Sequence, residues 1–200
     1  KTVMNVDIGG GTSKIAIIEA GKIVAASSIF VGSRVLAKDD LDQIIRIEES
    51  GIRAAREIGI DLRMGASISV AQQKAITDIL AKALFELIER KDLSPFTQTL
   101  METSPLQYDG IIDIIMFSGG VAEYIYGHER SDFGDLGLIL GKSIKHHVSD
   151  SRFSMTHQGP EERIRATVMG ASQYSIQVSG NTIFLSTSGA LPKRNLQVVK

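Results

Sequence analysis

The stretch "NVDIGGGTSKIAIIEAGKIV", Asn5 to Val24, decides the fold of this chain. Three consecutive glycines, Gly9 to Gly11, separate two short runs of aliphatic and β-branched residues. Runs of this length and composition predict strands over Thr2–Ile8 and Lys14–Ala20, joined at the glycines. A further strand over Lys22–Gly32 follows a short turn, so the sequence is expected to open with a three-strand antiparallel meander.

The composition is that of an ordinary globular chain. Its 200 residues are 43% hydrophobic and 22% charged, with a formal net charge of -1 and a pI near 6.5. This balance provides no basic field, so neither a nucleic acid nor a membrane is expected as a partner. The absence of cysteine excludes disulfides, thiol catalysis and cysteine-ligated metals. No apolar run approaches the roughly 20 residues of a membrane span, and a cytoplasmic location is the expectation.

The rest of the sequence alternates between helical and strand patterns. Apolar positions recur with helical spacing over 41–58, 69–90, 135–147 and 159–176. Ser69 and Gln72 have the spacing of a capping box at the start of the second of these helices. Buried strands are expected before Gly119 and over 181–187, and the proline-containing stretch 91–109 is expected to be a loop. The pattern predicts an α/β fold, with a mixed sheet and helices on its faces.

The glycine loop is suited to binding a polyphosphate. A turn without Cβ atoms lets successive backbone N–H groups point at phosphate oxygens, and Gly9, Gly10 and Gly11 provide such a turn. Thr12 and Ser13 add hydroxyl donors. Asp7, at the end of the first strand, is placed to hold Mg²⁺ directly or through water. The alternative is a glycine-rich hairpin turn that binds nothing.

A second pair of glycines lies in "MFSGGVAEYIYG", Met116 to Gly127. Gly119 and Gly120 follow a buried strand and precede a helix, which is where open α/β sheets bind their ligands. Their backbone would lie flat against a nucleoside. The alternative is a closely packed turn between strand and helix. Neither glycine loop has the Walker A or the G-x-G-x-x-G spacing.

Both loops together resemble those of a known ATPase superfamily. "VDIGGGTSKIAII" and "FSGGVAEYI" resemble the second phosphate loop and the adenosine loop of the superfamily of actin, sugar kinases and large heat-shock chaperones. The resemblance implies a ribonuclease H-like lobe that closes on Mg-ATP with a similar lobe. An Asp-x-Gly-Thr-Thr first phosphate loop does not occur in the sequence, and the chain enters a strand directly after Lys1. We therefore expect the second lobe of a longer protein.

Within this superfamily the closer resemblance is to the ethanolamine ammonia-lyase reactivating factors of ethanolamine utilisation operons. It rests on four blocks in order: "NVDIGGGTSKIAI", "TSPLQYDGIIDIIMFSGGVAEYIYG", "FGDLGLILGKSI" and "EERIRATVMGASQYSIQVSGNTIFL". It implies an ATP-dependent chaperone-like protein that releases damaged cobalamin from ethanolamine ammonia-lyase, its partner. A homo-oligomer and association with a bacterial microcompartment are compatible with it.

The resemblance assigns roles to individual residues. Asp7 would be the acid that binds Mg²⁺ or positions water. The phosphate loop would consist of Gly9–Gly11 and Thr12, and the adenosine loop of Gly119 and Gly120. ATP and Mg²⁺ are the implied cofactors. Residues 1–38 and 108–200 would form the nucleotide-binding subdomain, and residues 39–107 an inserted, mostly helical subdomain. ATPase activity is expected in the full-length protein and is negligible in this lobe alone.

Two other functions remain open at this stage. An actin-like filament or scaffold protein would use the same loops, with nucleotide controlling its assembly. A small-molecule kinase ranks third, because no catalytic base stands in a substrate-specific motif. A histidine metal site is disfavoured, since adjacent His146 and His147 diverge by about 100° on a helix.

Overall fold

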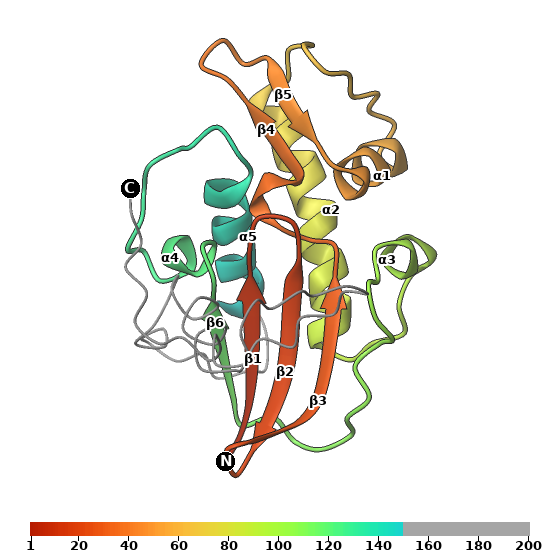
Figure 1. The fold of residues 1–200 in the computed structure, drawn as a ribbon, viewed down its shortest axis with the longest axis vertical. Helices are drawn as coiled ribbons and strands as arrows, with labels where there is room; N and C mark the ends of the chain where they lie inside the picture. Colours follow the sequence, from red (N-terminus) through yellow and green to blue (C-terminus); the bar gives the residue numbers. More distant parts are fainter. Residues whose placement is uncertain (150–200) are drawn as a thin grey trace, which may run out of the picture. The chain divides into compact units, whose positions relative to one another are not determined.

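The computed structural model describes residues 1–149 (Figure 1). The helix expected over 159–176 and the strand expected over 181–187 lie outside the described residues.

A four-stranded mixed sheet forms the centre of the described part. It consists of β1 (Thr2–Ile8), β2 (Ser13–Glu19), β3 (Lys22–Ile29) and β6 (Ile114–Ser118), in the order β3-β2-β1-β6. β1 to β3 pair antiparallel in sequence order, whereas β6 pairs parallel to β1. Because parallel strands end at the same edge of a sheet, β1 and β6 bring their two glycine loops together.

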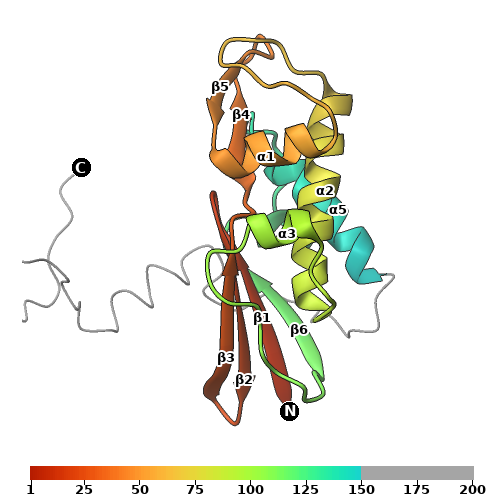
Figure 2. The ribbon, with the colours of Figure 1, turned by 90° about the vertical axis from the view of Figure 1, so that its right-hand side faces the viewer.

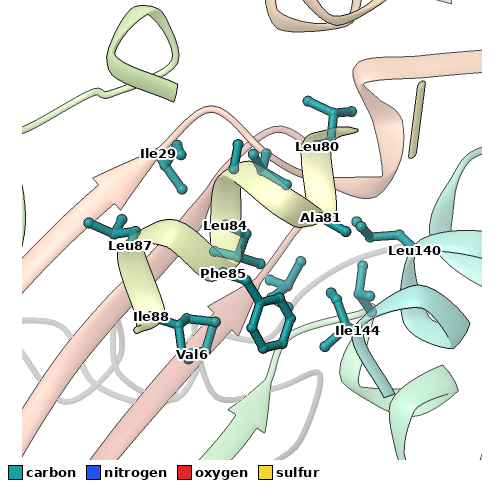
Figure 3. Close-up of a cluster of buried hydrophobic side chains, with 14 of the residues drawn as sticks. Val6, Ile29, Leu80, Ala81, Leu84, Phe85, Leu87, Ile88, Leu140 and Ile144 are labelled. Atoms are coloured by element: carbon teal, nitrogen blue, oxygen red, sulfur yellow. The ribbon is translucent and has the colours of Figure 1, made fainter. Parts of the chain in front are cut away.

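One face of the sheet is covered by two helices, α2 (Val70–Ile88) and α5 (Gly137–Ser149) (Figure 2). Alternation along β1 buries Met4, Val6 and Ile8 completely, while the residues between them are only partly buried. Figure 3 shows side chains of α2 lying between the strands and α5. Each fully buried large aliphatic side chain contributes roughly 1.5–3 kcal/mol relative to an exposed one.

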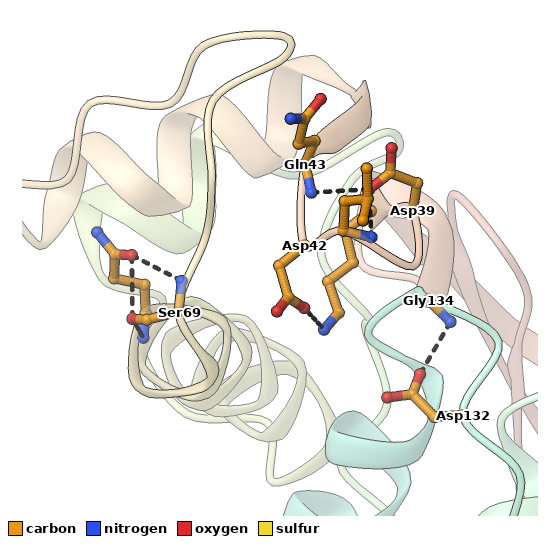
Figure 4. Close-up of polar contacts among 9 residues, drawn as sticks. Asp39, Asp42, Gln43, Ser69, Asp132 and Gly134 are labelled. Atoms are coloured by element: carbon orange, nitrogen blue, oxygen red, sulfur yellow. Dashed lines mark hydrogen bonds and ion pairs between the residues drawn. The ribbon is translucent and has the colours of Figure 1, made fainter.

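Helix α2 begins where the sequence predicts it. The Ser69 hydroxyl accepts a hydrogen bond from the Gln72 backbone N–H at 3.2 Å, and the Gln72 side chain accepts one from the Ser69 N–H at 3.0 Å. This reciprocal pair is the capping box (Figure 4). It satisfies two N–H groups that a helix start otherwise leaves unpaired, so the prediction of a helix over 69–90 is confirmed.

The helix predicted over 41–58 is wrong in its first half. The structure has β4 (Leu36–Lys38), β5 (Ile44–Ile47) and then α1 (Glu49–Glu57). The Asp39 carboxylate accepts the backbone N–H groups of Leu41 and Gln43, both at 2.9 Å (Figure 4). A short acidic side chain that binds nearby N–H groups favours a turn over a helix, and β5 then pairs back onto β4.

The segment 39–107 is the one expected to form an inserted, mostly helical subdomain. It contains β5 as well as α1, α2 and the short helix α3 (Pro95–Thr99), and α2 packs against the sheet within the common core. α3 lies in the stretch expected to be a loop, where the Ser94 hydroxyl caps its first turn. In Figures 1 and 2, β4, β5 and α1 lie beyond the end of the sheet where the glycine loop is.

Candidate functional site

The two glycine loops meet at one end of the sheet. Asp7 of β1 is paired in register with Ser118 of β6, and the chain turns immediately after both. A Cβ at Gly119 would stand 2.5 Å from the carbonyl oxygen of Ile8, and Gly119 has a φ of +83°. Close packing against β1 therefore requires glycine at this position. The second glycine loop therefore packs directly against the start of the first.

The first glycine loop is a tight turn between antiparallel strands. The Gly9 N–H donates to the carbonyl of Thr12 at 3.0 Å and closes the turn. The N–H groups of Gly10 and Gly11 have no acceptor among residues 1–149. A Cβ at Gly11 would meet nothing within 4 Å, and Gly11 is exposed. The turn therefore offers two unused backbone donors to a ligand.

A second segment, Gly32 to Arg34, lies directly against this loop. The Ser33 N–H donates to the Gly9 carbonyl at 3.0 Å, and the Arg34 N–H donates to the Gly10 carbonyl at 2.6 Å. These bonds occupy the carbonyl oxygens of the turn, which would otherwise repel an anion. Gly32 precedes η1 (Ser33–Val35), which leads from the sheet into β4.

Asp7 is held by side chains of both parallel strands. The Ser118 hydroxyl donates to Asp7 Oδ2 at 3.2 Å, and Asn5 Nδ2 donates to the Ser118 hydroxyl at 3.2 Å. Asp7 Oδ1 has no hydrogen-bond partner in the described part of the chain. A carboxylate with one fixed and one unused oxygen can take a cation, and Mg²⁺ needs only one or two carboxylates beside its water ligands.

Ser13 does not have the role that the sequence interpretation gives it. Its side chain is fully buried, and its hydroxyl donates to the Val31 carbonyl at 2.7 Å. Ser13 is the first residue of β2, where its side chain points to the same face as the buried Ile15 and Ile17. The hydroxyl therefore links β2 to the segment after β3 and is unavailable to a ligand.

Thr12 is only partly buried and lies beside Lys14. The Lys14 ammonium group donates to the Thr12 hydroxyl at 3.0 Å, in an exposed position. Thr12 thus remains at the open side of the turn, as its assigned role requires.

Helix α4 (Ala122–Ile125) follows the second glycine loop and is only four residues long. Its first residue is preceded by Val121, and no side chain of the described residues caps the helix. Gly120 precedes this helix and is partly buried. The Val121 N–H donates to the Ile8 carbonyl at 3.2 Å, which adds a second tie between the loops.

A cavity of about 630 Å³ lies elsewhere, between α1, α2 and α3. It is lined by charges of both signs, including the ion pair between Glu49 and Arg53 at 3.0 Å. The Glu86 carboxylate in its wall accepts the Ser94 N–H at 2.9 Å. Burial opposes ionisation of Glu86, but hydrogen bonds from Thr97 and Ser94 outweigh it and lower its pKa. These groups stabilise the start of α3 and do not form a reactive set.

Sequence reasoning missed Asn5, Gly32 and Arg34 at this site. A signal for the first existed, because Asn5 alternates with the apolar residues of β1 and shares a face with Asp7. Gly32 also stands out as a glycine at the end of a strand pattern. The contact of Arg34 with the turn depends on a path that local pattern does not specify.

The comparisons with known proteins point to one family. A family model described as ethanolamine utilisation protein EutA matches residues 1–200. The ethanolamine ammonia-lyase reactivase EutA of Escherichia coli (strain K12) is 36% identical over 202 residues, and that of Salmonella typhimurium (strain LT2) is 35% identical. Each alignment covers 98% of this chain and 42% of the relative, so the chain spans less than half the length of these relatives.

Among solved structures, component A of (R)-2-hydroxyglutaryl-CoA dehydratase from Acidaminococcus fermentans is similar, with a TM-score of 0.39 and 10% identity. The match covers 84% of this chain and 59% of that one. A likeness at this level does not identify a shared fold. No helix in the described part is both long and apolar enough to cross a bilayer.

Proposed function

Because this chain belongs to the ethanolamine utilisation protein EutA family, we propose that it is an ATP-binding lobe of a reactivating factor for ethanolamine ammonia-lyase. In this proposal the protein is a chaperone-like ATPase of the actin and heat-shock superfamily. It releases damaged cobalamin from the lyase, and it acts in the cytoplasm or in a bacterial microcompartment. The names of the relatives and the sequence blocks of both glycine loops support the proposal.

The observation that carries the nucleotide assignment is the turn at Gly9–Gly11. None of these glycines has a φ in the left-handed region, and none would place a Cβ closer than 3.5 Å to another part of the chain. The fold itself therefore does not require three glycines here. Glycine costs conformational entropy on folding, so a stretch of three indicates a ligand that approaches the backbone closely.

Each residue then has a defined part. The N–H groups of Gly10 and Gly11 donate to phosphate oxygens, and Thr12 adds its hydroxyl at the open side of the turn. Asp7, oriented by Ser118, holds Mg²⁺ through Oδ1 or through a water ligand. Gly119 and Gly120 lie beside the turn and accommodate the adenosine. Bound Mg²⁺ would neutralise charge on the phosphates, and Asp7 would keep its position fixed.

The moving part is proposed to be smaller than the inserted subdomain expected from sequence. β4, β5 and α1 lie beyond the end of the sheet, whereas α2 runs along its face (Figures 1 and 2). We infer that β4, β5 and α1 shift relative to the sheet when nucleotide binds, and that this motion signals to the lyase. In this proposal the nucleotide-binding subdomain expected over 1–38 and 108–200 gains α2, and β4 at the end of its first part moves with β5 and α1 instead.

The nucleotide assignment is tested with Asp7→Ala in the intact protein. We expect phosphate release from ATP to be abolished while the far-UV circular dichroism spectrum stays that of the wild type. Asp40→Ala is the matched control, because Asp40 is an exposed acid in the β4–β5 turn. Normal turnover by Asp7→Ala would contradict the role given to this carboxylate.

The reactivating function is tested by release of inactive cobalamin from the lyase. We expect release to need the protein and Mg-ATP together, and to fail with Asp7→Ala. Sedimentation with and without ATP tests the alternative, an actin-like filament or scaffold protein. ATP-dependent pelleting without cobalamin release would favour that alternative.

A further inference from the structure

Arg34 has a fixed position at the glycine turn. Its Cβ, Cγ and Cδ atoms would lie 3.5, 3.5 and 3.6 Å from a Cβ at Gly10, so the aliphatic stem covers the place where a side chain would stand. Its backbone N–H donates to the Gly10 carbonyl at 2.6 Å. The stem and the backbone N–H of Arg34 both contact Gly10, so the start of the Arg34 side chain is fixed relative to the turn.

The guanidinium group of Arg34 has no partner within residues 1–149. No hydrogen bond or ion pair links it to any of these residues, and Arg34 is exposed. By contrast, the guanidinium groups of Arg63 and Arg53 are engaged: Arg63 pairs with Asp61 at 2.8 Å, and Arg53 pairs with Glu49 at 3.0 Å. Arg34 thus brings an uncompensated positive charge to a turn with two unused N–H donors.

We propose that the Arg34 guanidinium binds the phosphates of the nucleotide at the glycine turn. This inference rests on the proposed function and names a residue that determines affinity for the polyphosphate. The guanidinium fork can donate two parallel hydrogen bonds to one phosphate, which a single backbone N–H cannot do.

The structure explains why this arginine is suited to the task. Gly32 is buried against the turn, and the hydrogen bonds of Ser33 and Arg34 to the carbonyls of Gly9 and Gly10 fix the segment. A side chain whose stem is already packed loses less conformational freedom on binding than a free surface arginine. The stem lies at van der Waals distance from the position of a Cβ at Gly10, so it packs on the turn without overlap.

The test is calorimetric titration of the intact protein with Mg-ATP and, separately, with adenosine. In Arg34→Ala we expect Mg-ATP affinity to fall by about tenfold to one hundredfold, the range for a hydrogen bond to a charged group. Adenosine affinity should stay within about twofold of the wild type, since adenosine carries no phosphate. Arg34→Lys should lie between the two, because it keeps the charge and loses the fork. Arg63→Ala, which removes an exposed arginine far along the chain, should change neither.

Several results would overturn the assignment. Unchanged Mg-ATP affinity in Arg34→Ala would remove Arg34 from the phosphate site and leave the nucleotide function intact. An equal loss for Mg-ATP and adenosine would mean that Arg34 only supports the fold. A wild-type protein that binds adenosine and Mg-ATP equally weakly, with no effect of magnesium, would refute the proposed nucleotide function together with this inference.

Discussion

Gly32→Ala should destabilise the protein through steric overlap alone. The backbone at Gly32 is extended, with φ of -166°, so alanine adopts the same conformation without strain. The added Cβ would lie 2.5 Å from the carbonyl carbon of Gly10 and 2.7 Å from the nitrogen of Gly11. An ordinary contact needs at least 3.4 Å, so the two segments must separate by about 0.9 Å. Only backbone atoms are involved, and no flexible side chain can give way.

The size of the effect follows from what this separation disrupts. It stretches the hydrogen bonds from Ser33 to Gly9 and from Arg34 to Gly10, each contributing about 0.5–1.5 kcal/mol net. Overpacking of a well-packed contact adds about 1–3 kcal/mol. Replacing glycine by alanine in an extended backbone returns about 0.4–1 kcal/mol through the unfolded state. We therefore expect a loss of about 2–4 kcal/mol in the free energy of unfolding.

The measurement is urea unfolding followed by circular dichroism, with Gly11→Ala as the matched control. A Cβ at Gly11 meets nothing within 4 Å, and Gly11 does not have a left-handed φ. This control should be as stable as the wild type or up to about 1 kcal/mol more stable. If Gly32→Ala unfolds within about 0.5 kcal/mol of Gly11→Ala, the segment does not pack on the turn as described.

Three further outcomes are expected. Ser118→Ala removes the donor to Asp7 Oδ2, so ATP turnover in the intact protein should fall by about tenfold. Ser118→Thr keeps the hydroxyl and should restore most of the turnover. An unchanged rate in Ser118→Ala would exclude a positioning role for Ser118. The pKa of Tyr124 is raised to about 12, first by burial and then by nearby carboxylates, so its contribution to stability is complete below pH 10 and is lost as the pH rises through 12. Between pH 10 and 12, Tyr124→Phe should therefore lose less free energy of unfolding than the wild type, as measured by urea titrations. If the unfolding free energies of both proteins fall in parallel with pH, the pKa of Tyr124 is not raised. The 200-residue chain alone should bind Mg-ATP at least about tenfold more weakly than the intact protein by calorimetry, because an open site leaves the phosphates hydrated; equal affinity would contradict this.

Local pattern was sufficient for the parts of the fold that depend on near neighbours. β1, β2 and β3 follow short apolar runs separated by turns, and α2 follows a helical stripe that begins at a capping box. The helix over 41–58 failed because the Asp39 carboxylate binds two local N–H groups and turns the chain. The spacing of apolar residues predicts a helix whether or not a nearby side chain competes for the backbone N–H groups.

The candidate site was predicted only in part, for a related reason. Asp7 and the turn lie within one short stretch of sequence and were found together. Ser118 meets Asp7 because β6 runs parallel to β1, which requires a crossover of about a hundred residues that local pattern cannot specify. Ser13 was assigned wrongly although its position alternates with Ile15 and Ile17, which already placed its side chain in the core.

The glycines show how such assignments are best judged. Gly32 and Gly119 are required by the fold, since a Cβ at either would overlap backbone atoms of the neighbouring segment. Gly11 meets open space, and Gly10 meets only the stem of Arg34 at an ordinary contact distance. Packing alone explains a glycine at which a Cβ would overlap the neighbouring segment. A run of glycines without such overlap needs another explanation, and a ligand that approaches the backbone provides one. By this criterion the evidence for phosphate binding lies in the turn at Gly9–Gly11, and Gly119 is explained by its contact with Ile8.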